Sequence, residues 1–111
     1  MYTRKKQGAI SIIEGTDALT GDYLEELNTL LQECMSSGQP RVVFSFKNTP
    51  LLDSAGLEWL LDSLETCLSG GGNLKLAAPN PLCEDILRIT GFLSKFEVYP
   101  DTLSAVGSYT H

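Results

Sequence analysis

Ser54 is the residue of this chain whose type and position best suit regulatory or nucleophilic chemistry. Asp53 precedes it, Ala55 and Gly56 follow it, and a strand-like run covers residues 41–46 just upstream. Because a long helical pattern begins after this segment, the sequence predicts a turn at a helix N-terminus. Free backbone N–H groups and the positive end of the helix dipole favour an anion there. A serine at this position can cap the helix or carry a phosphate.

A hydrolytic role for Ser54 requires a general base within reach. The only histidine is His111, the last residue, and Lys47 belongs to no recognisable serine–lysine motif. The Gly70-Gly71-Gly72 run precedes a strand-like segment instead of the Gly-Lys-Ser/Thr of a P-loop, which predicts a helix end and no nucleotide site. We therefore predict a protein that is not an enzyme and needs no cofactor.

The three cysteines, Cys34, Cys67 and Cys83, form no Cys-x-x-Cys pair. Cys34 and Cys67 fall on or near apolar helix faces, where cysteine behaves as a small hydrophobic residue. We expect buried free thiols and no metal site.

Composition and charge narrow the range of functions that this chain can have. The chain has 111 residues and a net charge of −6, and three of its eight basic residues cluster at Arg4, Lys5 and Lys6. The acidic remainder argues against nucleic-acid binding. No apolar run is long enough for membrane insertion, and no signal peptide is recognisable, so we expect a cytoplasmic protein with one domain over residues 1–111. The oligomeric state is left open.

Hydrophobic patterning predicts alternating strands and helices. Strand-like segments cover residues 1–6, 9–13, 42–46, 73–77 and 96–99, and helical patterns follow Thr20, Ser54 and Asn80, with a last helical turn over residues 101–106. The expected helix caps are Thr20 and Asn80. This order predicts an α/β fold with a mostly parallel central sheet, an N-terminal β-hairpin and helices packed on the sheet.

Two motifs in this order resemble the signatures of STAS domains, the fold of anti-sigma factor antagonists. The first is the strand at residues 42–46 followed by Leu52-Asp53-Ser54-Ala55-Gly56-Leu57, and the second covers residues 86–98, a helix that ends in Thr-Gly and leads to an aromatic-containing strand. The resemblance extends over about residues 9–106.

The resemblance implies a protein partner, an anti-sigma factor that is also a serine kinase and phosphorylates Ser54. It also implies that Asp53, Ala55 and Gly56, which match the motif, contact the partner together with Asp17. Ser45 stands where the family usually has an aspartate. The alternative within the family is a STAS subunit of a larger assembly, such as a stressosome or a lipid-transport complex, without phosphorylation control.

Trp59 falls about 150° from the centre of the leucine stripe of its predicted helix at 100° per residue. The sequence therefore predicts an exposed tryptophan, a residue type that often anchors protein interfaces. Glu58 and Asp62 flank it and are expected to attract a basic partner. The predicted partner-binding residues are Asp17, Asp53, Ala55, Gly56, Leu57, Glu58, Trp59 and Asp62.

Overall fold

Five strands form one sheet in the order β1-β2-β3-β4-β5 in this computed structural model, which describes residues 1–35 and 38–110. The strands are β1 (Tyr2–Gln7), β2 (Ile10–Gly15), β3 (Arg41–Ser45), β4 (Asn73–Ala77) and β5 (Val98–Tyr99). β1 pairs antiparallel with β2, and the other pairs are parallel. The predicted hairpin and mostly parallel sheet are confirmed, whereas His111 lies outside the described residues.

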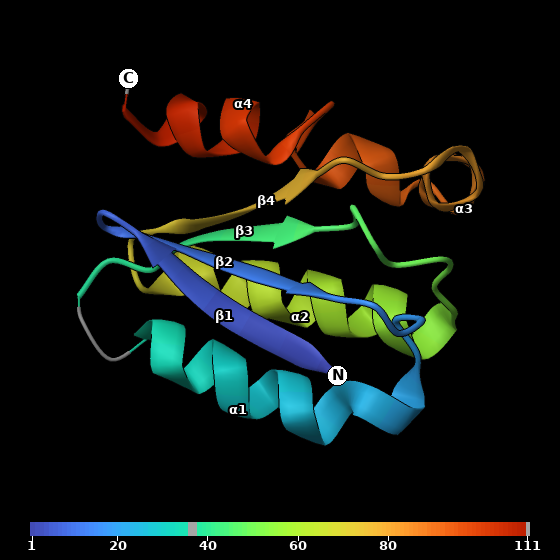
Figure 1. Ribbon diagram of the computed structural model, residues 1–111, viewed down its shortest axis with the longest axis horizontal. Helices are drawn as coiled ribbons and strands as arrows, with labels where there is room; N and C mark the ends of the chain where they lie inside the picture. The colour runs from blue at the N-terminus through green and yellow to red at the C-terminus, as the bar shows by residue number, and fades with distance from the viewer. Residues whose placement is uncertain (36–37, 111) are drawn as a thin grey trace.

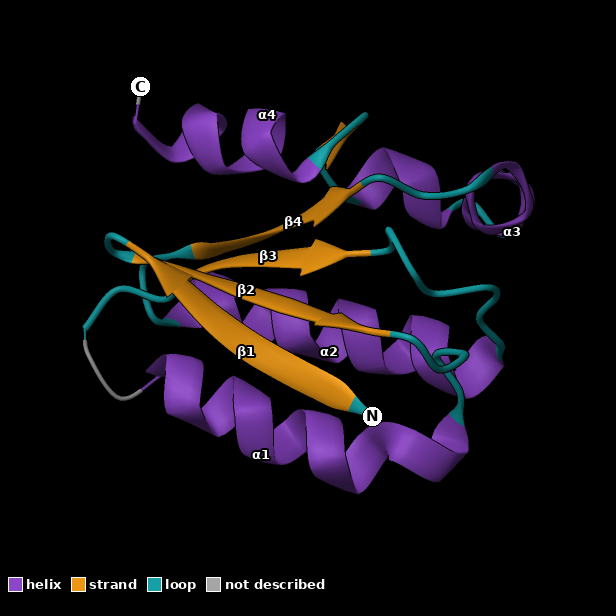
Figure 2. Ribbon diagram, in the orientation of Figure 1, coloured by secondary structure: helices purple, strands orange, loops and turns teal. Residues whose placement is uncertain are grey.

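Helices cover both faces of this sheet (Figure 1). They are α1 (Leu24–Met35), α2 (Ser54–Ser69), α3 (Pro81–Ile89) and α4 (Thr102–Gly107), with 3-10 turns η1 (Gly21–Tyr23), η2 (Phe92–Lys95) and η3 (Ser108–Thr110). Figure 2 shows α1 and α2 on one side of the strands and α4 on the other. The sheet is therefore the middle layer of the molecule.

β3 is the central strand of the sheet, and its position explains why its sequence is apolar without alternation. Val42 and Phe44 pack into the core under α1 and α2, and Val43 packs with Ala105 and Val106 of α4. A strand buried on both faces needs apolar residues at successive positions.

Trp59 corrects one expectation from the sequence. Its side chain is only 6% exposed, because α2 packs on the sheet with one side and against the neighbouring helix α1 with another. The indole Nε1 donates to Asn28 Oδ1 of α1 at 2.8 Å, and its ring meets Phe44 edge-on at 5.9 Å between centroids. The helical-wheel argument assumed a single buried face and was wrong.

Of the two predicted helix caps, only Asn80 makes the expected side-chain hydrogen bond within the described residues. Asn80 caps α3 as expected, since its Oδ1 accepts the Cys83 N–H at 2.7 Å and Pro81 occupies the first helical position. Thr20 occupies the expected position just before η1, but within the described residues its side chain makes no capping hydrogen bond.

Candidate functional site

Asp53 is the residue that caps α2. Its Oδ1 accepts the Gly56 N–H at 2.9 Å, and its carbonyl accepts the Leu57 N–H at 3.0 Å. Ser54 is the first helical residue and is exposed. Because Asp53 already fills the capping position, the Ser54 hydroxyl is left at the surface beside the N-terminal amides of the helix.

The loop after β2 holds this turn in place. Leu19 N–H donates to Leu51 O at 2.9 Å, and Asp53 N–H donates to Leu19 O at 3.2 Å. Gly56 lies against the same carbonyl, because a Cβ at this position would sit 2.2 Å from Leu19 O. The glycine of the motif is therefore needed for close approach of two backbone segments.

Asn80 ties a third segment to the same edge of the sheet. Its Nδ2 donates to Pro50 O at 3.1 Å and to Thr49 O at 3.4 Å, while its Oδ1 caps α3. The segments that follow β2, β3 and β4 are thus joined by hydrogen bonds at the carboxyl ends of the strands. In open α/β sheets, ligands bind outside the carboxyl ends of the strands.

Asp17 lies in the loop that contacts the Ser54 turn. Its backbone O accepts the Tyr2 hydroxyl at 2.7 Å, and its carboxylate pairs with the Met1 ammonium group. The structure therefore brings Asp17 to the same end of the sheet as Ser54, on a neighbouring segment.

The other predicted partner residues divide into exposed and buried ones. Glu58 and Asp62 line a shallow groove of about 310 Å³ between α1 and α2, as does the edge of Trp59. Gly56 and Leu57 are buried, with Leu57 only 5% exposed in the core. We therefore correct the prediction for these two residues, because both positions serve packing.

Ser45, at the position where the family usually has aspartate, is fully buried. Its hydroxyl lies 3.1 Å from Thr102 Oγ1 of α4 and accepts the Lys47 N–H at 3.3 Å. These contacts are on the face of the sheet opposite α2. Ser45 therefore joins β3 to the start of α4.

The three cysteines are free and buried, as predicted. Burial raises the pKa of Cys67 to about 12 and also raises the pKa values of Cys34 and Cys83. The thiols therefore stay protonated and poorly nucleophilic at neutral pH. Within the described residues, no group of three or more His, Cys, Asp or Glu side chains is arranged to hold a metal ion.

Sequence reasoning missed Lys75, a buried lysine on β4. Its ammonium donates to Ser108 Oγ at 2.8 Å, lies 3.6 Å from Glu97 Oε1 and sits 4.2 Å from the centre of the Tyr109 ring. A charge in the otherwise apolar Leu-Lys-Leu-Ala run was the available signal. These contacts attach the C-terminal segment to the sheet.

Family comparison agrees with this architecture. The model of the STAS domain family matches residues 3–105. The chain belongs to the STAS domain family. Comparison with curated protein sequences finds no match. Among the helices that the structure describes, none is long and apolar enough to cross a membrane.

Several solved structures share this STAS fold. An anti-sigma-factor antagonist (STAS) domain protein from Planctomyces limnophilus has a TM-score of 0.88 at 16% identity, covering 99% of this chain and 98% of that one. Unphosphorylated SpoIIAA, an anti-sigma factor antagonist, has a TM-score of 0.82 at 13% identity, covering 99% and 96%. SpoIIAA of Bacillus also has a phosphorylated form of known structure, with a TM-score of 0.73 at 12% identity, covering 98% and 99%.

A sulfate transporter family protein from Wolinella succinogenes has a TM-score of 0.80 at 17% identity, covering 94% of this chain and 87% of that one. At these identities the likeness establishes the fold.

Proposed function

We propose that this STAS domain is an anti-sigma factor antagonist of the cytoplasm, which binds an anti-sigma factor with serine kinase activity and is released when Ser54 is phosphorylated. The observation that carries the proposal is the exposed Ser54 hydroxyl at the first position of α2, where Asp53 already provides the cap. The similarity to antagonists, including one with a phosphorylated form, supports it.

Phosphorylation of Ser54 adds a charge of about −1.5 to −2 at neutral pH. The free amides at the N-terminus of α2 can stabilise this charge, so the fold should persist. The phosphate instead lowers the affinity for the partner, because it adds charge beside Asp53 and Glu58 on a surface that must be desolvated in the complex. A loss of about 3 kcal/mol corresponds to about a hundredfold in affinity, which is enough to release a partner.

The partner surface that we propose consists of residues around Ser54 that reach the surface. It includes the turn at Asp53 and Ala55, the carboxylates of Glu58 and Asp62, and the adjoining loop with Asp17. Such an acidic surface suits a basic patch on the partner. Trp59 supports this surface from below through its bond to α1 and is no longer proposed as an anchor.

The proposal is tested with a serine kinase of the anti-sigma factor class, sought among the products of genes beside that of this chain. Incubation with this kinase and ATP should place phosphate on Ser54, as mapped by mass spectrometry, and Ser54→Asp should weaken binding about a hundredfold in a titration. Ser69→Asp is the matched control, because it adds the same charge at the exposed far end of α2 and should bind as wild type. Phosphate on another residue, or full affinity of Ser54→Asp, would contradict the proposal.

The second candidate function is a STAS subunit of a larger assembly without phosphorylation control. The replacement of the usual aspartate by Ser45 favours it, as does the likeness to a sulfate transporter family protein. A stable complex with a partner that lacks a kinase fold, with equal affinity for wild type and Ser54→Asp, would support this candidate.

A further inference from the structure

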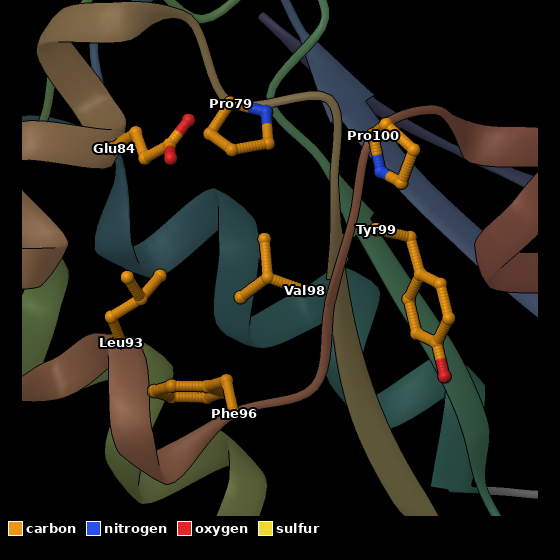
Figure 3. A pocket seen from close by; sticks show the side chains of 7 residues that line it. All are labelled: Pro79, Glu84, Leu93, Phe96, Val98, Tyr99 and Pro100. Atoms are coloured by element: carbon orange, nitrogen blue, oxygen red, sulfur yellow. The ribbon is translucent and has the colours of Figure 1, made fainter.

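A hollow of about 590 Å³ lies away from Ser54, where α3, η2 and β5 meet. Figure 3 shows the side chains of Leu93, Phe96 and Val98 along one part of its wall. Pro79 and the Glu84 carboxylate lie on the opposite part. Tyr99 and Pro100 complete the lining, so the hollow opens at the carboxyl ends of β4 and β5.

The chemistry of this wall combines an apolar surface with a single negative charge. Phe96 is buried in the main core, and the partly buried Leu93 and Val98 pack against that core. Glu84 is exposed in the first turn of α3, and its carboxylate has no ion-pair partner in the part of the chain that the structure describes. Such a surface fits a ligand that carries an apolar group next to a cationic group.

The strand beside the hollow has an unpaired edge. Leu76 N–H donates to Glu97 O and Ala78 N–H donates to Tyr99 O, both at 2.9 Å, so residues 97 and 99 of the β5 segment bond toward β4. Val98 lies between them, and alternation along a strand directs its N–H and C=O away from β4. Because β5 is the last strand in the sheet order, these two groups face outward beside the hollow.

We infer that this hollow is a docking site for an extended peptide segment of a partner protein. The peptide backbone bonds to the outward N–H and C=O of Val98, as in strand addition to a sheet edge. One aliphatic or aromatic side chain packs against Leu93, Phe96 and Val98, and a neighbouring lysine or arginine pairs with Glu84. The net charge of −6 favours such a basic peptide over phosphate-bearing ligands.

This inference goes beyond the proposed antagonist function, because it adds a second interaction site with its own recognition chemistry. Its test begins with a display library of random peptides selected on the immobilised wild-type protein. The selected sequences should pair a lysine or arginine with an aliphatic or aromatic residue. Selection of acidic sequences, or of none, would overturn the inference.

Variants then locate the peptide on the surface. In fluorescence anisotropy, Glu84→Lys should lower the affinity for the selected peptide at least about tenfold through charge reversal. Leu93→Trp should lower this affinity by filling the hollow. Glu65→Lys is the matched control, because it makes the same charge change at an exposed position of α2 outside the hollow and should leave affinity unchanged. Wild-type affinity in both Glu84→Lys and Leu93→Trp would overturn the site.

Two further measurements distinguish the hollow from the Ser54 surface and from a contact between two copies of the chain. Addition of the peptide should shift the backbone amide resonances of residues 93–99 and slow exchange of the Val98 N–H, whereas shifts confined to residues 51–58 would overturn the inference. Sedimentation of the wild-type protein should show a monomer at all concentrations. A dimer that forms with rising concentration and is lost in Glu84→Lys would assign the hollow to a second copy of the chain. Ser54→Asp should bind the peptide normally, so failure of the antagonist proposal leaves this result intact.

Discussion

Asp53 and Ser54 have separate tasks at the start of α2, although they are adjacent. Asp53→Ala should lower the free energy of unfolding by about 1 kcal/mol, because the Gly56 N–H loses its acceptor. Urea denaturation measures this change, and Asp53→Asn, which keeps an acceptor, should cost less. Ser54→Ala should be close to neutral for stability. A larger loss for Ser54→Ala than for Asp53→Ala would show that the serine is the cap.

Trp59 contributes to stability through the contact between α2 and α1. Trp59→Ala should cost about 3–5 kcal/mol of unfolding free energy, because it leaves a large cavity beside Phe44. Asn28→Ala isolates the hydrogen bond to the indole and should cost only about 1 kcal/mol. Urea denaturation of both variants makes the comparison. Wild-type stability of Trp59→Ala would restore the view that this side chain is free at the surface.

At the scale of elements, α4 and η3 are attached to the sheet by side chains of the C-terminal segment. The Tyr109 hydroxyl lies 2.8 Å from the carbonyl oxygens of both Val42 and Asn73, which share its single proton, and it accepts the Val42 N–H at 3.3 Å, so it joins β3 and β4. Tyr109→Phe should cost about 1–3 kcal/mol, because it leaves buried polar groups with fewer partners. Amide hydrogen exchange should increase most in α4.

Tyr99→Phe provides the matched control for this loss of a hydroxyl. The Tyr99 hydroxyl donates to Glu97 Oε1 at an exposed position. Its removal should therefore change stability and exchange in α4 much less than Tyr109→Phe. Equal effects of the two variants would contradict the anchoring role of Tyr109.

The elements themselves were predictable because their signals are local. Helical spacing of leucines, the Asn80-Pro81 start of α3 and the apolar run at residues 42–46 each report a nearby physical preference. The position of Trp59 was not predictable in this way, because it depends on α1 covering a second side of α2. Lys75 was missed for a similar reason, since its partners come from residues that follow much later in the chain.

The candidate site was predictable in part. The motif placed Ser54 at the start of a helix, and the structure agrees. The motif does not reveal that Gly56 is required by the carbonyl of Leu19, or that Asn80 reaches Pro50. These contacts join segments that are distant in sequence, so only the assembled fold defines them.

At the scale of the whole molecule, buried groups that lose a proton at high pH make the fold sensitive to alkali. Burial raises the pKa of Tyr2 from 10.0 to about 12 and that of Cys67 from 9.0 to about 12, and it also raises the pKa of Tyr109. The folded protein therefore keeps protons that the unfolded chain releases. Stability is fully present below about pH 9 and falls as the pH rises toward 12.

This dependence can be measured as the free energy of unfolding in urea at a series of pH values from neutral to alkaline. The slope should be negative above about pH 9, because the unfolded state binds fewer protons than the folded state. Cys67→Ala removes one of the titrating groups and should make the slope shallower, although its lower volume reduces stability at every pH. A slope that stays flat through about pH 11, or that Cys67→Ala leaves unchanged, would mean that these groups reach solvent in the folded protein.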